Sequence, residues 1–133
     1  METEIANVRG NVPVTILRLR GDFDANSAPQ FDEIAGNEIG SGVKDILVEF
    51  NEVRFMSSSG IRSLNKLYNS LHENRSEEAK RSSNEGIRDG TYQAEHLKLL
   101  NPSSSVCDVL KMVGLDMVLG IFDNEQEAIA AFK

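Results

Sequence analysis

The sequence predicts an α/β domain in which helices pack against a sheet that contains parallel strand pairs. Short runs rich in β-branched residues and leucine alternate with stretches whose apolar residues recur every three or four positions, which are the periods of strands and amphipathic helices. Such alternation is typical of strands joined by crossover helices. The 133 residues and the 40% apolar content suffice for one core. We therefore expect residues 1–133 to form a single domain.

Two strands are expected at the start of the chain. Residues 4–9 are a weak candidate, because Ile5 and Val8 are their only large apolar residues. Val12 to Arg20 is a stronger candidate, since β-branched residues and leucine dominate it. Pro13 belongs at the start of that strand or on a sheet edge, because proline cannot donate a hydrogen bond to a ladder.

A loop, a helix and a third strand come next. Gly21 to Asn26 has the composition of a loop, and Asn26 or Ser27 can cap the helix that follows. Gly40 to Gly42 ends that helix. The segment Val43 to Phe50 is almost continuously apolar after its first residues, which indicates a central strand covered on both faces.

Three consecutive serines stand where this strand gives way to the second helix. Ser57, Ser58 and Ser59 precede Gly60, which allows close approach of another backbone. A helix N-terminus leaves backbone N–H groups without partners and favours anions. A serine there can cap the helix or carry a phosphate close to those donors. The helix has an apolar stripe formed by Ile61, Leu64, Leu67, Tyr68 and Leu71.

Residues 72–95 differ in character from the rest of the chain. They have almost nothing to bury, so burial cannot offset the entropy of ordering them. We expect a long, polar, flexible insert that is exposed to solvent. A connection of this length inside a compact domain is unusual and is either disordered or a contact surface.

Two strand–helix pairs are expected after the insert. His96 to Leu100 is a short strand, and Ser103 or Ser104 can cap the helix behind it. A brief strand near residues 119–122 leads to a last helix capped by Asn124. The apolar stripe of the first of these helices is Val106, Val109, Leu110 and Val113.

Composition argues against several classes of function. The net charge of −7 opposes unaided binding to nucleic acid or anionic lipid. Cys107 is the only cysteine, which rules out an internal disulfide and fits a reducing cytosol. The first residues lack the pattern of a signal peptide, and no apolar run approaches the roughly 18–20 residues that span a membrane. We expect a cytoplasmic protein without direct membrane insertion, and the sequence leaves its oligomeric state open.

Six stretches of the chain form an ordered set of motifs. They are Leu17 to Asp24, Ile46 to Val53, Phe55 to Ile61, Asn101 to Pro102, Val113 to Leu115 and Ile121 to Ala128. In order and spacing they resemble the STAS domain, the family of bacterial anti-sigma factor antagonists. That family has a glycine and acidic turn after the second strand, an aspartate-serine-serine-glycine-aliphatic signature, and a glycine-leucine pair before an acidic helix start. The resemblance implies a small mixed β-sheet with helices packed mainly on one face.

The resemblance also implies a regulatory protein-binding module. In this family the first serine of the signature is phosphorylated by a partner, an anti-sigma factor that is a serine kinase, and that position falls on Ser58. The unphosphorylated form binds the kinase and frees a sigma factor, and phosphorylation breaks the complex. The implied partner surface comprises the acidic turn at Asp24 and the helix start at Ser57, Ser58, Ser59, Gly60, Ile61 and Arg62.

The chain departs from the family pattern in two places. Ser57 stands where the family has an aspartate, and the insert at 72–95 replaces a tight connection. Ser57 and Ser59 are therefore alternative phosphate acceptors to Ser58. The alternative function is that of a non-phosphorylated scaffold, because some STAS domains serve in transporter, lipid-transport or stress-signalling complexes.

Other polar residues have simple structural explanations. Asp24 can stabilise its turn by bonds to the backbone as well as contact a partner. His72 and His96 lie far apart in sequence without the spacing of metal ligands, and Cys107 has no evident activating neighbour. Catalysis would need a base held against a serine nucleophile, and no motif supplies one. We expect no enzyme activity, no metal and no cofactor.

Overall fold

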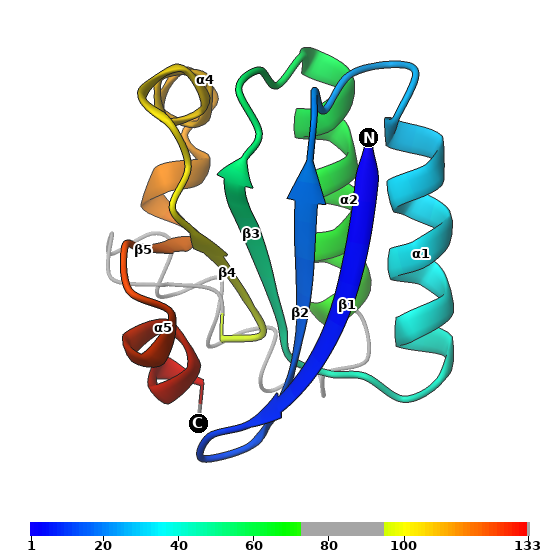
Figure 1. Cartoon of the computed structure of the whole chain (residues 1–133), viewed down its shortest axis with the longest axis vertical. Coiled ribbons are helices and arrows are strands. Elements are labelled where there is room, and N and C mark those ends of the chain that lie inside the picture. The colour runs from blue at the N-terminus through cyan, green and yellow to red at the C-terminus, as the bar shows by residue number, and fades with distance from the viewer. Residues whose placement is uncertain (73–94, 133) are drawn as a thin grey trace.

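The computed structural model describes residues 1–72 and 95–132, which form a five-stranded sheet with helices packed against it (Figure 1). The strands, in their order across the sheet, are Glu2–Arg9 (β1), Pro13–Arg20 (β2), Ile46–Glu52 (β3), Leu97–Leu100 (β4) and Gly120–Phe122 (β5). The helices are Ala28–Gly40 (α1), Ser58–His72 (α2), Ser104–Met112 (α4) and Glu125–Ala131 (α5), with a short 3-10 turn at Leu115–Met117 (η1). The predicted order of elements is confirmed, with an earlier start of β1 and with η1 as an addition.

The sheet is mixed, as the sequence predicts. β1 and β2 are antiparallel, with Ile5 opposite Leu17. The remaining neighbours are parallel, so that Leu17 pairs with Val48 of β3 and Val48 pairs with Leu99 of β4. Parallel pairing brings the carboxyl ends of β2, β3 and β4 to the same edge of the sheet. At that edge β3 passes into the loop that leads to α2 (Figure 1).

Two apolar layers cover the sheet, one on each face. The larger layer joins α1, α2 and α4 to side chains such as Leu17 and Val48. The smaller layer joins Phe132 at the end of α5 to Ile16 and Leu47. Of the described helices, three therefore cover one face and one covers the other, which confirms that the helices pack mainly on one face. β3 contributes to both layers and is the central strand that its apolar sequence predicted.

Charged and aromatic side chains on the second face fasten α5 to the sheet. The Arg18 guanidinium donates a hydrogen bond to Glu49, and another at 2.6 Å to Glu125 in the first turn of α5. The hydrogen bond to Glu125 raises the pKa of Arg18; burial acts in the opposite direction, and Glu49 adds to the rise. Nearby, Nζ of Lys98 lies 5.2 Å from the ring centroid of Phe132. Both ends of α5 are thus held by contacts beyond simple apolar packing.

The helix caps agree with the sequence in two cases and differ in one. The side chains of Ser103 and Asn124 each accept a backbone N–H in the first turn of their helices, at 3.2 and 3.0 Å respectively. Ser27 precedes α1 but makes no side-chain cap bond. Its hydroxyl instead donates to the carbonyl oxygen of Asp22 at 2.8 Å, so this serine stabilises the preceding loop.

The prediction that Val113 lies on the buried stripe of α4 is wrong, because its side chain is 52% exposed. α4 ends at Met112, and the backbone of Val113 has left the helical conformation, with φ −103° and ψ 2°. Its side chain therefore turns away from the stripe. Gly114 follows with φ +77°, a left-handed conformation that glycine adopts without strain and that commonly ends helices.

The predicted insert at 72–95 lies outside the described residues, apart from its two ends. Those ends meet in space, since the rings of His72 and His96 have centroids 5.3 Å apart. Nδ1 of His96 also lies 2.8 Å from Oδ1 of Asp45. In the described part of the chain, no group of three or more His, Cys, Asp and Glu residues could hold a metal ion. Within residues 1–72 and 95–132, none of the helices has the length and apolarity needed to cross a membrane.

Candidate functional site

The acidic loop at 21–26 is bonded directly to the segment that begins α2. The N–H of Phe23 donates to the carbonyl oxygen of Phe55, and the N–H of Ser57 donates to the carbonyl oxygen of Phe23, both at 2.9 Å. These bonds make Phe23 and Met56 a short parallel bridge beyond the end of β3. The bridge sets the point at which extended backbone ends and the helix begins.

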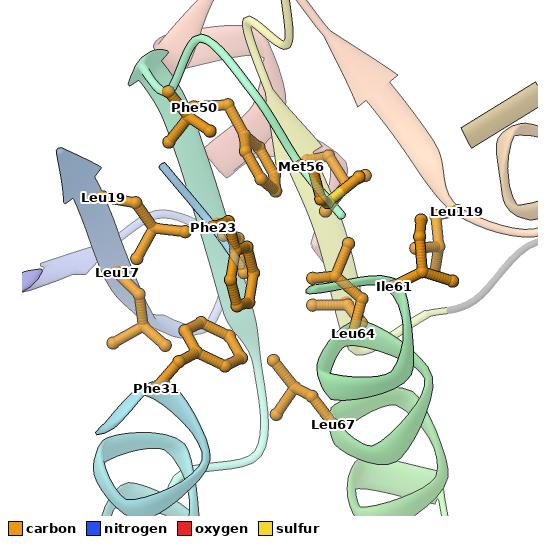
Figure 2. Close-up of a cluster of buried hydrophobic side chains, with 14 of the residues drawn as sticks. Leu17, Leu19, Phe23, Phe31, Phe50, Met56, Ile61, Leu64, Leu67 and Leu119 are labelled. Atoms are coloured by element: carbon orange, nitrogen blue, oxygen red, sulfur yellow. The ribbon is translucent and has the colours of Figure 1, made fainter. Parts of the chain in front are cut away.

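The side chain of Phe23 anchors this loop in the core. It is fully buried, and its ring centroid lies 4.8 Å from that of Phe31 in α1. Figure 2 shows the ring between β-strand side chains and the first turn of α2, near Met56 and Ile61. Burial of a phenylalanine side chain stabilises a fold by about 1.5–3 kcal/mol. The acidic loop is therefore held firmly against the helix start.

Gly60 allows the loop and the helix to approach closely. A Cβ atom at this position would lie 2.8 Å from the carbonyl oxygen of Phe23 and 2.7 Å from Cγ of Met56. Both distances are shorter than contacts that real Cβ atoms make, so any other residue would have to displace a neighbour. The close approach predicted from the glycine is confirmed.

The three serines occupy three different environments. Ser57 precedes the helix, and its Oγ accepts the backbone N–H of Ser59 at 3.2 Å while its carbonyl oxygen accepts the N–H of Ile61 at 3.1 Å. This is the pattern of an N-cap. The hydroxyl of Ser59 accepts a hydrogen bond from the Arg62 guanidinium at 3.2 Å. Ser58 is exposed, and its hydroxyl makes no hydrogen bond to any described residue.

The carboxylate of Asp24 stabilises its own turn. Its Oδ1 accepts the backbone N–H of Asn26 at 3.0 Å and that of Ser27 at 3.2 Å. The backbone carbonyl oxygen of Asp24 accepts the N–H of Ala28 at 2.8 Å, at the start of α1. The side chain is half-buried. Asp24 thus fixes the conformation of the acidic loop, and one of its edges faces solvent.

The residues predicted to contact a partner divide into an outer and an inner group. Ser58 and Arg62 are exposed, whereas Ser57 and Ser59 are half-buried. Gly60 is buried against Phe23, and the side chain of Ile61 belongs to the larger core, where it is 9% exposed. The inner pair, Gly60 and Ile61, therefore positions the helix start, and Ser58 and Arg62 face solvent.

A groove of about 230 Å³ runs beside this surface, between α1 and α2. Asp32 lies on the α1 side, and Arg62 and Lys66 lie on the α2 side, so both signs of charge face the groove. Its other lining residues are Ala25, Ala28, Pro29, Ser59 and Ser63.

Exposed apolar side chains lie outside the set that the sequence indicated. Phe55, directly before the serines, is 49% exposed, and Met112 and Met117 are 85% and 72% exposed. Contiguous apolar patches mark protein contacts, whereas single exposed apolar side chains are common on protein surfaces. The sequence pattern could have predicted the exposure of Met112, because this residue lies off the apolar stripe of its helix. It could not have predicted the exposure of Phe55, which depends on the bridge between Phe23 and Met56.

Sequence and structure comparisons identify related proteins. A model of the STAS domain family matches residues 5–77, which is more than half of the chain. No curated protein matches the chain in sequence.

Several solved structures share the fold. An anti-sigma factor antagonist from Mycobacterium paratuberculosis superposes with a TM-score of 0.73 at 15% identity, over 98% of this chain and 92% of that chain. The Bacillus cell fate determinant SpoIIAA in its phosphorylated form gives a TM-score of 0.65 at 23% identity, over 99% of this chain and 100% of that chain. A sulfate transporter family protein from Wolinella succinogenes gives a TM-score of 0.58 at 19% identity, over 88% of this chain and 82% of that chain. At such identities the likeness establishes a common fold.

Proposed function

The chain belongs to the STAS domain family, and from this premise we propose that it is a regulatory binding module of the anti-sigma factor antagonist type. Its partner is an anti-sigma factor with serine kinase activity. Phosphorylation of Ser58 switches the interaction off, and residues 1–133 act as one domain.

The observation that carries this proposal is the exposed hydroxyl of Ser58. Of the three serines, Ser57 is committed to capping α2 and Ser59 is held by Arg62, whereas the Ser58 hydroxyl has no described partner to give up. A kinase must extract its acceptor hydroxyl from existing hydrogen bonds before transfer. Phosphorylation of Ser58 therefore breaks the fewest existing hydrogen bonds, which favours Ser58 over Ser57 and Ser59 as the acceptor.

A phosphate at this position explains a switch without a change of fold. It adds about −1.5 to −2 charges next to the N-terminus of α2, where the helix dipole favours an anion. The domain itself therefore tolerates the modification. A partner packed over Ser58 would have to desolvate the dianion, and each 1.4 kcal/mol of that cost weakens binding about tenfold. Phosphorylation thus acts at the interface.

Ser57 retains one function of an aspartate at the same position. Serine and aspartate are comparable N-caps, so the start of α2 is fixed by either residue. What is lost is one negative charge beside the acceptor. The proposed partner therefore meets a less acidic surface than the family signature would give, which favours a kinase that does not require an acidic neighbour.

Site-resolved phosphorylation tests the proposal. Incubation with ATP and the anti-sigma factor kinase from the same organism should add one phosphate, which peptide mass spectrometry should locate on Ser58. The Ser58→Ala variant should stay unmodified, and Ser59→Ala serves as the matched control that should still be phosphorylated. Modification of Ser59 in the parent protein, or none at all, would overturn the assignment.

A non-phosphorylated scaffold is the second candidate. It is favoured by the fold shared with a sulfate transporter family protein and by Ser57 at the position of the family aspartate. In that case the same surface holds a permanent partner in a transporter, lipid-transport or stress-signalling complex. Ser58→Ala would then behave like the parent protein in co-purification of the complex, and no phosphate would be found on α2 in cells.

A further inference from the structure

The guanidinium of Arg62 is already directed toward the first turn of α2. Its Nη2 donates to Oγ of Ser59 at 3.2 Å, and the side chain is exposed. Side chains on a helix lean toward its N-terminus. Arg62 thus places a positive charge beside the serines.

Ser58 and Arg62 are four residues apart in the same helix. Residues at this spacing lie on the same face, one turn above the other, and their side chains can touch. Both side chains are exposed, so no buried group separates them. A phosphate on Ser58 therefore lies within the reach of a guanidinium that now donates a hydrogen bond to the neutral hydroxyl of Ser59.

The chemistry favours exchange of that hydroxyl for the phosphate. The guanidinium is charged in both bonds, but only the phosphate adds an opposite charge, and the planar fork of arginine matches two phosphate oxygens. The other charged residues that line the adjoining groove are Asp32 of α1 and, on α2 itself, Lys66. The Asp24 carboxylate of the acidic loop is engaged with the backbone of its own turn. Arg62 is the cation one turn from Ser58, and Lys66 lies one turn further away.

We propose that Arg62 is the internal counter-ion of phosphorylated Ser58. On phosphorylation it leaves Ser59 and pairs with the phosphate oxygens, which holds the phosphate against α2 as a dianion. This inference rests on the proposed function, because it assumes that Ser58 carries the phosphate. As a consequence, the charge that a partner meets at this site is the sum of the phosphate charge and the opposite charge of Arg62.

Phosphorus NMR of the full chain tests the pairing directly. Phosphoserine installed at position 58 during translation makes the sample independent of any kinase. We expect Arg62→Ala to move the pH midpoint of the phosphate resonance upward by about half a pH unit, because an exposed ion pair to the dianion is lost. Lys66→Ala removes the same charge one turn further away and should move the midpoint by less than half as much.

Two results would overturn the proposal. One is an unchanged midpoint in Arg62→Ala, and the other is an equal shift in Lys66→Ala, which would indicate a general charge effect. Arg62→Lys should give an intermediate midpoint, since it keeps the charge and loses the fork. Failure of a kinase to modify Ser58 would count against the proposed function alone, because this titration does not use the kinase.

Discussion

Replacing Gly60 by alanine should destabilise the protein, because the added methyl group has no room. It would lie 2.8 Å from the carbonyl oxygen of Phe23 and 3.1 Å from Cγ of the same residue, as well as 2.7 Å from Met56 Cγ. Met56 can move, but the Phe23 carbonyl oxygen is held by the N–H of Ser57. Overpacking costs about 1–3 kcal/mol, and the better helix propensity of alanine returns at most about 1 kcal/mol. The net loss should be about 1–2 kcal/mol.

Urea unfolding measures this loss. With a denaturant dependence of about 1–3 kcal/mol per molar urea, the midpoint should fall by about 0.3–2 M. Gly36→Ala is the matched control, because Gly36 lies in α1 and a methyl group added there would meet nothing within 4 Å beyond the backbone of its own helix. There the same substitution should raise stability by about 0.5–1 kcal/mol. A midpoint for Gly60→Ala at or above that of the parent protein would refute the packing argument.

The remaining predictions concern the cap of α2 and the attachment of α5. Ser57→Ala should lower the unfolding free energy by about 1 kcal/mol, whereas Ser57→Asp should keep the cap; equal losses in thermal unfolding would contradict the capping role. Arg18→Met removes the cation paired with Glu49, whose side chain is 10% exposed, and leaves that carboxylate with the hydrogen bond from Asn51. Arg18→Met should lower the unfolding free energy by about 2 kcal/mol. Glu125→Gln should lower it by less, because the side chain of Glu125 is 40% exposed. Since the pKa of Arg18 is raised, the stability that its charge contributes is lost only in strong alkali. If Arg18→Met and the parent protein had equal unfolding free energies by about pH 9, this would be contradicted.

The order of elements could be predicted because the local spacing of apolar residues indicates each helix and strand. The apolar run before Phe50 and the stripe of α2 are properties of contiguous segments, and Asn124 is a capping residue with a helical pattern directly behind it. The choice among the three serines was different. Ser57 is the cap because its backbone is fixed by Phe23, a residue from a distant loop. No local pattern contains that bond.

Contacts between elements that are remote in sequence likewise could not be predicted from the sequence. Arg18 meets Glu125 only because β2 and β3 pair in one register and α5 crosses the second face of the sheet. His72 and His96 were judged by their spacing along the chain, yet their rings pack together across the ends of the insert. Periodicity identifies which faces are apolar, and topology decides which polar side chains meet.

The most direct test of the central claim is the affinity of the anti-sigma factor for the two forms of the protein. Titration calorimetry should use the unmodified chain and the chain with phosphoserine installed at position 58, at one salt concentration because charge contacts are screened by salt. We expect phosphorylation to weaken binding at least about tenfold, corresponding to about 1.4 kcal/mol of desolvation cost at the interface. Equal affinities for the two forms would contradict the claim that Ser58 is the switch.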